Sequence, residues 1–299
     1  MPIEKVLVTG GTGRLGRFVV DELKRHYRVA ALDRDAATAP DIAVDVRDLP
    51  RLVDAMRGQH AVVHLAAIDS SVPAPAAAVF DTNVRGTWNV LEAAHATEVR
   101  HVVICSSASA LGTDFTNPGM PPVYLPIDEA HPLRPTQAYG LSKQLGEEIA
   151  RSFARRRAVA ITCLRPTWVM FPETLESLVG RLRKGPETGP PPAGQEPLPL
   201  LRGYVDPEDA ARAFRLALAR PEAAGDIFFI TASDTFEAEP TLRHLERLYG
   251  SVPEVRKQDA YRQNPHASVY DISRAREILG WTPAVTWADL VDRVDSPPG

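Results

Sequence analysis

The sequence of 299 residues has few cysteines, no long apolar run and little net charge. Its two cysteines, Cys105 and Cys163, fall in strand-like apolar stretches and indicate small buried side chains instead of a disulfide framework. No apolar stretch approaches the roughly 20 residues that cross a bilayer. Residues 1–5 lead directly into a strand-like run, without the apolar core of a signal peptide. We therefore expect a soluble, cytoplasmic protein.

Charge and histidine spacing argue against a nucleic-acid or membrane partner and against a metal site. The formal net charge of −4 gives no electrostatic reason to expect a nucleic-acid or membrane partner. The basic clusters at 155–157 and 181–184 are short, and we interpret them as solvated helix faces. The eight histidines show no metal-ligand spacing, and neither Cys-x-x-Cys nor His-Glu-x-x-His occurs, so no metal site is predicted.

Strand-like and helix-like segments alternate through the first two thirds of the chain. The apolar runs predicted as buried parallel strands are 6–9, 29–32, 42–46, 61–66, 101–106 and 158–164. The segments of helical composition between them are 13–26, 49–56, 76–96 and 136–157. This alternation predicts an α/β fold, a doubly wound parallel sheet with helices on both faces. Ligands of such sheets bind beyond the carboxyl ends of the strands.

The first predicted strand ends in a glycine cluster that leads into a helix. Glycine allows the chain to reverse tightly, to approach a pyrophosphate and to pack the helix close to the strand. The amides and dipole of the helix start favour an anion. The cluster can be read as Gly11-x-Gly13-x-x-Gly16 or as Gly10-x-x-Gly13-x-x-Gly16. Its position between a strand and a helix predicts a dinucleotide-binding turn of the Rossmann type.

Acidic residues follow the next two predicted strands. A carboxylate at Asp33 can accept hydrogen bonds from both ribose hydroxyls of an adenosine and would repel a 2′-phosphate. This residue therefore favours NAD over NADP. Its neighbour Arg34 instead favours NADP, because a guanidinium can pair with that phosphate. Asp45 could bind the adenine edge or only cap the following turn.

A tyrosine and a lysine share one face of the predicted helix 136–157. Tyr139 and Lys143 are four residues apart, and an ammonium near a phenol stabilises the phenolate, which lowers the pKa of the tyrosine. Ser107, at the end of the fifth predicted strand, can donate a hydrogen bond to the same substrate oxygen. Together they could remove a proton from a hydroxyl while its carbon gives a hydride to a nicotinamide. The proline-rich stretch 108–135 between them is a plausible binding wall.

These motifs occur together in one known family. The chain resembles the extended short-chain dehydrogenase/reductase family, in its NAD-dependent sugar epimerase/dehydratase branch, over nearly its whole length. The matching positions are residues 9–16, 33, 45–48, 64–67, 83–87, 91–94, 106–107, 128–129, 132, 135, 139–143, 165–166, 204–206, 209, 279–281 and 283. The resemblance also selects the Gly10-x-x-Gly13-x-x-Gly16 reading, because Tyr139 and Lys143 accompany that spacing.

The resemblance implies a set of site residues. Ser107, Tyr139 and Lys143 would be catalytic, and Lys143 would also hold the nicotinamide ribose. The predicted NAD-binding set is Gly10, Gly13, Arg14, Leu15, Gly16, Asp33, Arg34, Asp45, Val46, Leu65, Ala66, Ala67, Asn83, Tyr139, Lys143 and Pro166. The predicted substrate-binding set is Ser107, Ala108, Tyr139, Arg202 and Arg262. Asp209 would buttress the fold, and His64 would lie near the cofactor without being a metal ligand.

The resemblance also implies an organisation and a partner. Residues 1–170 would form the NAD-binding Rossmann domain, with segments near 204–231 and 266–273 returning to it. Residues 171–203 and 232–299 would form a smaller, C-terminal substrate-binding lobe. Two long helices per subunit, 76–96 and 136–157, would build a homodimer.

Departures from the family pattern limit the substrate assignment. No acidic pair accompanies Ser107, which argues against dehydration, and the Gly- and Pro-rich run 189–194 sits in a short recognition segment. Arg202 matches an arginine that meets the diphosphate of nucleotide sugars, and Arg262 matches a second one with its register off by one residue. Two arginines could clamp a diphosphate, or serve a carboxylate or the surface.

Three functions follow from these observations. The leading one is a nucleotide-sugar epimerase that retains its NAD. The alternative is an NAD-dependent dehydrogenase or reductase of a smaller sugar, sugar acid or carbonyl compound, which the short recognition segment favours. A non-catalytic dinucleotide-binding protein is a remote third reading, because such relatives lose the tyrosine or the lysine that this chain keeps.

Overall fold

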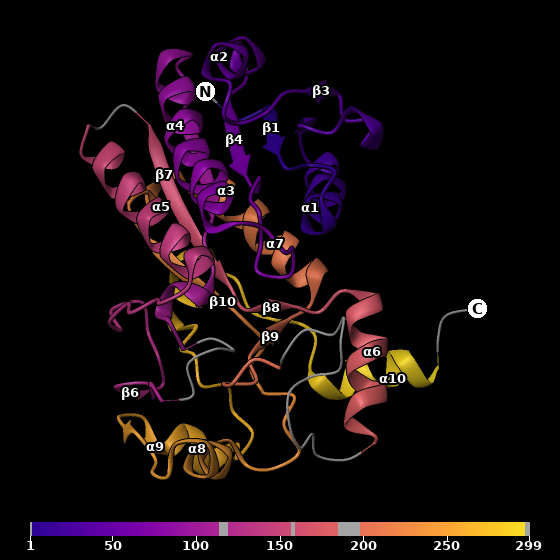
Figure 1. Ribbon diagram of the computed structural model, residues 1–299, viewed down its shortest axis with the longest axis vertical. Helices are drawn as coiled ribbons and strands as arrows, with labels where there is room; N and C mark the ends of the chain where they lie inside the picture. Colours follow the sequence, from indigo (N-terminus) through magenta and orange to yellow (C-terminus); the bar gives the residue numbers. More distant parts are fainter. Residues whose placement is uncertain (1, 114–118, 157–158, 185–197, 297–299) are drawn as a thin grey trace.

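A seven-stranded parallel sheet forms the centre of the computed structural model, which describes residues 2–113, 119–156, 159–184 and 198–296 (Figure 1). The strands lie in the order β10-β7-β5-β4-β1-β2-β3. They are β1 (Lys5–Thr9), β2 (Arg28–Asp33), β3 (Ile42–Ala43), β4 (Ala61–His64), β5 (His101–Cys105), β7 (Ala160–Pro166) and β10 (Ile227–Ile230). The chain runs outward from β1 in one direction and from β4 in the other, so the order reverses between these two strands. That reversal is where such sheets bind ligands.

Alternate residues of β1 face two separate cores. Val6 and Val8 belong to one buried apolar cluster and Leu7 to another, because successive side chains of a strand point to opposite faces. The helices of the first face are α1 (Arg14–Lys24) and α7 (Pro207–Leu218), and those of the second are α2 (Leu49–Met56), α4 (Gly86–Ala96) and α5 (Ala138–Arg155). Both faces are covered, which explains why the strand sequences are continuously apolar. The predicted α/β fold class is confirmed.

The remaining elements are short. They are η1 (Ala36–Thr38), α3 (Ala76–Phe80), η2 (Asp81–Arg85), η3 (Ala108–Leu111), β6 (Tyr124–Leu125), β8 (Trp168–Val169), α6 (Pro172–Leu182), β9 (Tyr204–Val205), η4 (Pro221–Ala223), α8 (Thr241–Tyr249), β11 (Glu254–Val255), α9 (Gln258–Gln263), η5 (Ala275–Leu279) and α10 (Trp287–Asp295). Two small parallel pairs, β8 with β9 and β6 with β11, lie outside the main sheet. Among the described helices, none has the length and apolar character needed to cross a membrane.

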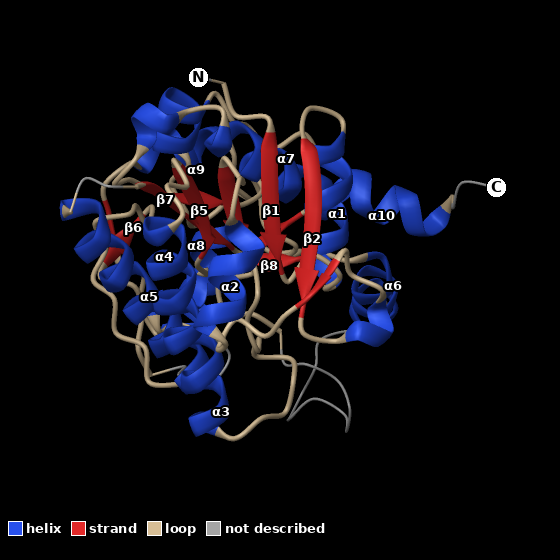
Figure 2. Ribbon diagram, turned by 90° about the horizontal axis from the view of Figure 1, so that it is seen from above, coloured by secondary structure: helices blue, strands red, loops and turns tan. Residues whose placement is uncertain are grey.

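A third apolar cluster lies apart from the two sheet cores. It joins Leu175 and Leu178 of α6 to Tyr204 of β9 and Leu290 of α10. Phe236, from the segment before α8, belongs to it as well. Figures 1 and 2 both show α6 and α10 side by side at the edge of the molecule, beyond the sheet. This part of the chain therefore has its own buried centre.

Some predicted strands end later than the observed ones, because the apolar run continues past the last residue that pairs with a neighbouring strand. Predicted strand 42–46 forms only Ile42–Ala43, and strand 61–66 ends at His64. Predicted helix 76–96 is continuous but contains the π-helical segment η2. The start of strand 158–164 and the end of helix 136–157 lie outside the described residues, as does the run 189–194.

Candidate active site

The glycine turn after β1 has the backbone that its sequence predicts. Gly10 has a φ of 70°, and a Cβ there would lie 2.7 Å from the Ala66 nitrogen at the end of β4. A Cβ on Gly16 would lie 2.1 Å from the Gly10 oxygen. Helix α1 starts after Gly13 without a side-chain cap, so its first amides are available to an anion. Only glycine at these positions keeps strand, turn and helix this close.

A cavity of about 410 Å³ runs along the carboxyl ends of β1, β2, β4 and β5. It is lined by most of the predicted cofactor residues. These are Gly10, Gly13, Arg14, Leu15, Gly16, Asp33, Arg34, Asp45, Val46, Leu65, Ala66, Ala67, Tyr139, Lys143 and Pro166. The predicted substrate residues Ser107 and Ala108 line it as well. Residues far apart in the sequence therefore meet at the point where the strand order reverses.

Asp33 and Asp45 lie at the β2 and β3 end of this cavity. Asp33 accepts hydrogen bonds from the Thr12 hydroxyl (2.8 Å) and from the Arg34 amide (2.8 Å), which fix its carboxylate. Asp45 accepts from the Arg47 amide (2.9 Å) and from its guanidinium, and this contact lowers the pKa of Asp45. Asp45 is thus both a lining residue and the cap of the following turn.

Ser107, Tyr139 and Lys143 come together at the β5 end of the cavity. Ser107 caps η3 by accepting from the Ser109 amide (3.1 Å), and its side chain lies close enough to Tyr139 to lower the pKa of that phenol. Lys143 Nζ donates to the Cys105 oxygen (2.8 Å) and lies 5.5 Å from the centre of the Tyr139 ring. Helix α5 supplies the tyrosine and lysine one turn apart, and the end of β5 supplies the serine.

The pKa of Tyr139 departs from our expectation. Burial raises it, the fields of Cys105 and Asp69 act in the same direction, and the hydrogen bond from Ser107 lowers it. The lowering that we predicted from Lys143 is not among the causes of the shift; the Lys143 ammonium is buried and donates to the Cys105 oxygen. Burial acts on Lys143 in the opposite direction and lowers its pKa.

Asn83 lies beside the cavity and does not line it. Its side chain accepts from the Ile68 amide (2.8 Å) and donates to the Ile68 oxygen (2.9 Å). It also donates to the Ser142 hydroxyl of α5 (3.0 Å). Asn83 therefore fixes the segment after β4 against the helix that carries Tyr139 and Lys143. His64, buried nearby between Thr9 (2.7 Å) and Thr87 (3.1 Å), is a packed strand-end residue.

The two arginines predicted to meet a substrate anion are not directed together into the cavity. Arg262, on α9, is exposed, contacts Asp259 and Gln258 of its own helix, and is absent from the described cavity lining. Leu201 and Gly203 line the cavity, but the guanidinium of Arg202 between them donates to Glu237 (3.0 Å).

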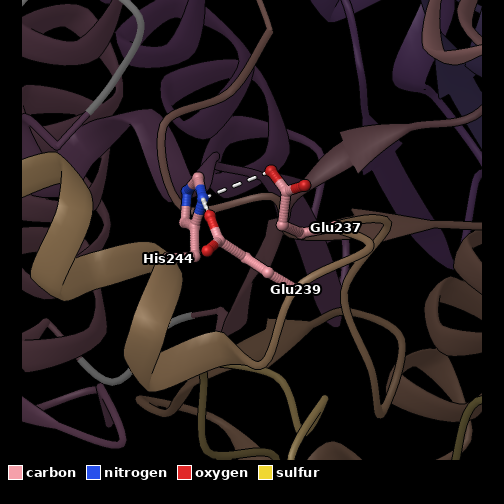
Figure 3. Close-up of side chains that lie close together, drawn as sticks. All are labelled: Glu237, Glu239 and His244. Carbon is pink, nitrogen blue, oxygen red and sulfur yellow. Dashed lines mark ion pairs between the residues drawn. The ribbon is translucent and has the colours of Figure 1, made fainter. Parts of the chain in front are cut away.

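Glu237 belongs to a charged cluster with Glu239 and His244 (Figure 3). The Nδ1 atom of His244 faces both carboxylates, and this contact lowers the pKa of Glu237 to about 2, with the charge of Arg202 acting in the same direction. Arg247 pairs with Glu239, and its guanidinium also lies 3.0 Å from His244 Nδ1. Two guanidinium groups thus balance the two carboxylates, and the cluster ties Arg202 to α8.

The cavity also contains functional-site candidates that the sequence reading missed. Thr12 holds Asp33, and Asp69, Trp168 and Tyr270 line the cavity. Asp69 sits two residues after the 64–67 motif, which is the signal that could have identified it. Trp168 and Tyr270 lie in segments without a motif, and only the fold brings them to the site.

Residues 6–230 match the sequence model of the NAD dependent epimerase/dehydratase family. The chain belongs to this family. It is an NAD-dependent enzyme of the extended short-chain dehydrogenase/reductase type. The predicted family and enzyme class are confirmed.

Similar proteins have different substrates in their names. An L-arabinose 1-dehydrogenase (NAD(P)(+)) of Haloferax volcanii is 32% identical over 56% of this chain and 67% of its own length. A UDP-glucose 4-epimerase of Corynebacterium glutamicum is 28% identical over 94% of this chain and 92% of its own length. The chain spans 53% to 67% of the first four curated relatives that it matches. By name, these relatives act on a free sugar, a sugar phosphate, a sugar nucleotide or a lipid-linked sugar.

The cofactor of the family fits the observed cavity. A short-chain dehydrogenase/reductase superfamily protein of Agrobacterium tumefaciens, solved with bound NAD, is 28% identical and covers 97% of this chain and 96% of its own, with a TM-score of 0.69. In the present chain the glycine turn and the uncapped start of α1 line the cavity, where they suit a pyrophosphate, and Asp33 presents a carboxylate suited to ribose hydroxyls. The predicted NAD cofactor is confirmed.

Proposed function

We propose that the chain oxidises a hydroxyl-bearing carbon of a small sugar or sugar derivative, with Ser107, Tyr139 and Lys143 as the acting residues. When bound, NAD supplies the acceptor for the hydride that this carbon loses. Tyr139 takes the proton of the hydroxyl, and Ser107 donates a hydrogen bond to the same oxygen. Two observations support this arrangement: Ser107 and Tyr139 line the same cavity, and the Ser107 side chain lowers the pKa of Tyr139.

Lys143 keeps the tyrosine usable as a base. Because burial raises the pKa of Tyr139, the phenolate needs a compensating positive charge. We propose that Lys143, one helical turn away with Nζ 5.5 Å from the ring centre, provides it during the reaction. Its second role is to hold the nicotinamide ribose. Asn83 supports both roles indirectly, because it anchors the neighbouring Ser142 to the segment after β4.

The placement of two arginines favours a net dehydrogenase of a small substrate over a nucleotide-sugar epimerase. A diphosphate needs cationic side chains at the substrate end of the cavity. Arg262 is exposed on α9, and Arg202 is engaged by Glu237. This observation carries our choice of the smaller substrate.

A nucleotide-sugar epimerase is the second candidate. It is supported by the UDP-glucose 4-epimerase of Corynebacterium glutamicum, whose alignment extends over 94% of this chain. In that case Arg202 exchanges Glu237 for a diphosphate when substrate binds, and NAD stays on the enzyme through both half-reactions.

One experiment separates the two candidates. The full chain is incubated with NAD and a panel of free sugars and nucleotide sugars, and both NADH and sugar products are quantified. NADH that accumulates in proportion to an oxidised free sugar supports the dehydrogenase. A nucleotide sugar that interconverts without net NADH overturns it in favour of the epimerase, and a panel left unchanged contradicts both.

We further propose the division of labour that the family resemblance implies. Residues 1–170, with 204–231 and 266–273, hold NAD, and residues 171–203 and 232–299 hold the substrate. The separate apolar cluster around Leu175, Phe236 and Leu290 supports a second folding centre in the C-terminal part.

We also propose a homodimer through α3, α4 and α5. Exposed apolar side chains on these helices support it, namely Phe80 (50% exposed), Trp88 (40%) and Leu141 (41%). Large exposed apolar side chains on adjacent elements are typical of interaction surfaces.

A further inference from the structure

We infer that Asp69 is the substrate-recognition carboxylate of this cavity: it accepts hydrogen bonds from neighbouring hydroxyls of a neutral sugar and rejects anionic substrates. The inference rests on the proposed function, which it narrows from sugars and sugar derivatives to uncharged polyhydroxy compounds. Asp69 lines the cavity together with Ser107, Tyr139 and Lys143.

The position of Asp69 is fixed by its neighbours. The preceding residue, Ile68, has both its amide and its carbonyl bonded to Asn83, and Asn83 is bonded in turn to Ser142 of α5. Oδ1 of Asp69 accepts from the Ser71 amide (2.7 Å) and from the Ser71 hydroxyl. These contacts fix the position of the Asp69 carboxylate relative to the helix that carries Tyr139 and Lys143. Its other oxygen, Oδ2, is the one that we assign to the substrate.

The charge of Asp69 reaches the reacting groups. Its field raises the pKa of Tyr139 and of Lys143. Asp69 therefore lies close enough to the catalytic end of the cavity to act on both side chains. An ionised carboxylate is an acceptor only, so it matches the hydroxyls of a sugar and repels a phosphate or carboxylate group.

Positive charge is scarce at this end. Among the described lining residues, the arginines are Arg14 and Arg34, which follow β1 and β2 at the cofactor half. Arg14 is also engaged by Glu173 (2.8 Å) and by the Thr174 hydroxyl (2.7 Å). Lys143 is the one described lining cation near Asp69, and it is reserved for Tyr139 and the cofactor. The segments 114–118 and 185–197 contain no lysine or arginine in their sequence.

Hydroxyl groups line the same cavity instead. Ser70, Ser71, Ser109, Thr113 and Thr167 line the cavity with Asp69, and Trp168 adds an aromatic ring. Hydroxyls can both donate to and accept from a sugar, while a carboxylate accepts only. This combination recognises a polyol and offers little to a second negative charge.

The test compares a neutral hexose or pentose with its matching uronic acid, in which one CH₂OH group is replaced by a carboxylate. The wild-type chain with NAD is expected to prefer the neutral member of each pair. In Asp69→Asn, which keeps the side-chain shape, we expect kcat/KM for the neutral sugar to fall about 10- to 100-fold, mainly through KM. The preference over the uronate should fall at least about tenfold, because the repulsion is removed.

Asp45→Asn is the matched control, since it removes the same charge at the opposite end of the same cavity. It is expected to change KM for NAD while leaving the ratio of sugar to uronate as in the wild type. A wild-type preference for the uronate, or an unchanged ratio in Asp69→Asn, overturns the inference while sugar oxidation itself stands. If the wild type acts on no sugar, the proposed function fails and the inference falls with it.

Discussion

At the scale of single residues, Tyr139 carries the proposed chemistry. Replacement by phenylalanine removes the proton acceptor and leaves the ring, so we expect kcat to fall by about 10² to 10⁴. The affinity for NAD should change little, because Lys143 and the glycine turn remain. Steady-state kinetics and equilibrium binding of NAD measure the two quantities on the same protein. Turnover at the wild-type rate would remove Tyr139 from its role.

His64 makes the folded chain sensitive to acid. Burial, with the charge of Lys143 in the same direction, lowers the pKa of His64 from 6.5 to about 3. Between these values the unfolded chain binds a proton that the folded chain does not, so this contribution to stability is complete above pH 6.5 and is lost as pH falls below it. At about pH 5 the loss amounts to about 2 kcal/mol relative to neutral pH.

The matching variant is His64→Gln. Its free energy of unfolding, measured by urea denaturation at several pH values, should depend less steeply on pH below 6.5 than that of the wild type. Burial lowers the pKa of His101 to about 4, and this residue remains in the variant. Part of the pH dependence of the free energy of unfolding is therefore retained. Identical slopes for the two proteins would contradict the role given to His64.

Sequence reasoning located the residues whose identity depends on local spacing. The glycine turn, Asp33 and the pair Tyr139 and Lys143 sit at positions that one strand or one helix determines, and all line one cavity. Arg262 shows the limit, because its match was off by one residue and a helix face, not the motif, decides where its side chain points. Asp69 lies two residues beyond the 64–67 motif, and the contacts of Asn83 with the preceding Ile68, which help to place it, join segments that are apart in the sequence.

At the scale of elements, one buried ion pair connects the sheet to the catalytic helix. Arg165 of β7 donates to both carboxylate oxygens of Glu147 on α5, each at 2.7 Å, and both side chains are fully buried. The Ser106 hydroxyl at the end of β5 donates to the same carboxylate (2.6 Å). The pair thus connects β5, β7 and α5 directly behind Ser107.

Removing one partner of this pair should be costly. Glu147→Gln leaves a buried guanidinium without its counter-charge, and we expect the free energy of unfolding to fall by about 3 to 5 kcal/mol. Urea denaturation measures it. The apolar double variant Glu147→Leu with Arg165→Met should recover most of the loss, since neither charge remains buried. A single variant as stable as the wild type would show that the pair does not hold α5 on the sheet.

Element type followed from the sequence more readily than element ends. The apolar runs of β1 and β4 are buried on both faces, so composition alone identified them. The ends moved because the last residues of a run, such as Val46, turn to line the cavity instead of extending the ladder. The segment η2 carries no sequence signal that distinguishes it from the α-helix on either side.

At the scale of the whole molecule, the homodimer remains a prediction with a direct test. We expect the wild type to be a dimer by light scattering. Trp88→Glu places a charge on an exposed apolar side chain of α4 and should yield a folded monomer, with an unchanged circular dichroism spectrum. Val252→Glu is the matched control, because Val252 is 37% exposed and lies outside α3, α4 and α5. A monomeric wild type, or a dimeric Trp88→Glu, contradicts the proposed interface.

We propose that the cavity oxidises a sugar carbon, with Tyr139 taking the proton of its hydroxyl. The most direct measurement uses a turned-over sugar that carries deuterium on the carbon to be oxidised, incubated with the full chain and NAD. Mass spectrometry should find one deuterium in NADH for each molecule of oxidised sugar, and neither product with Tyr139→Phe at comparable times. Oxidised sugar formed with unlabelled NADH, or an altered sugar that retains its deuterium without NADH, would contradict it.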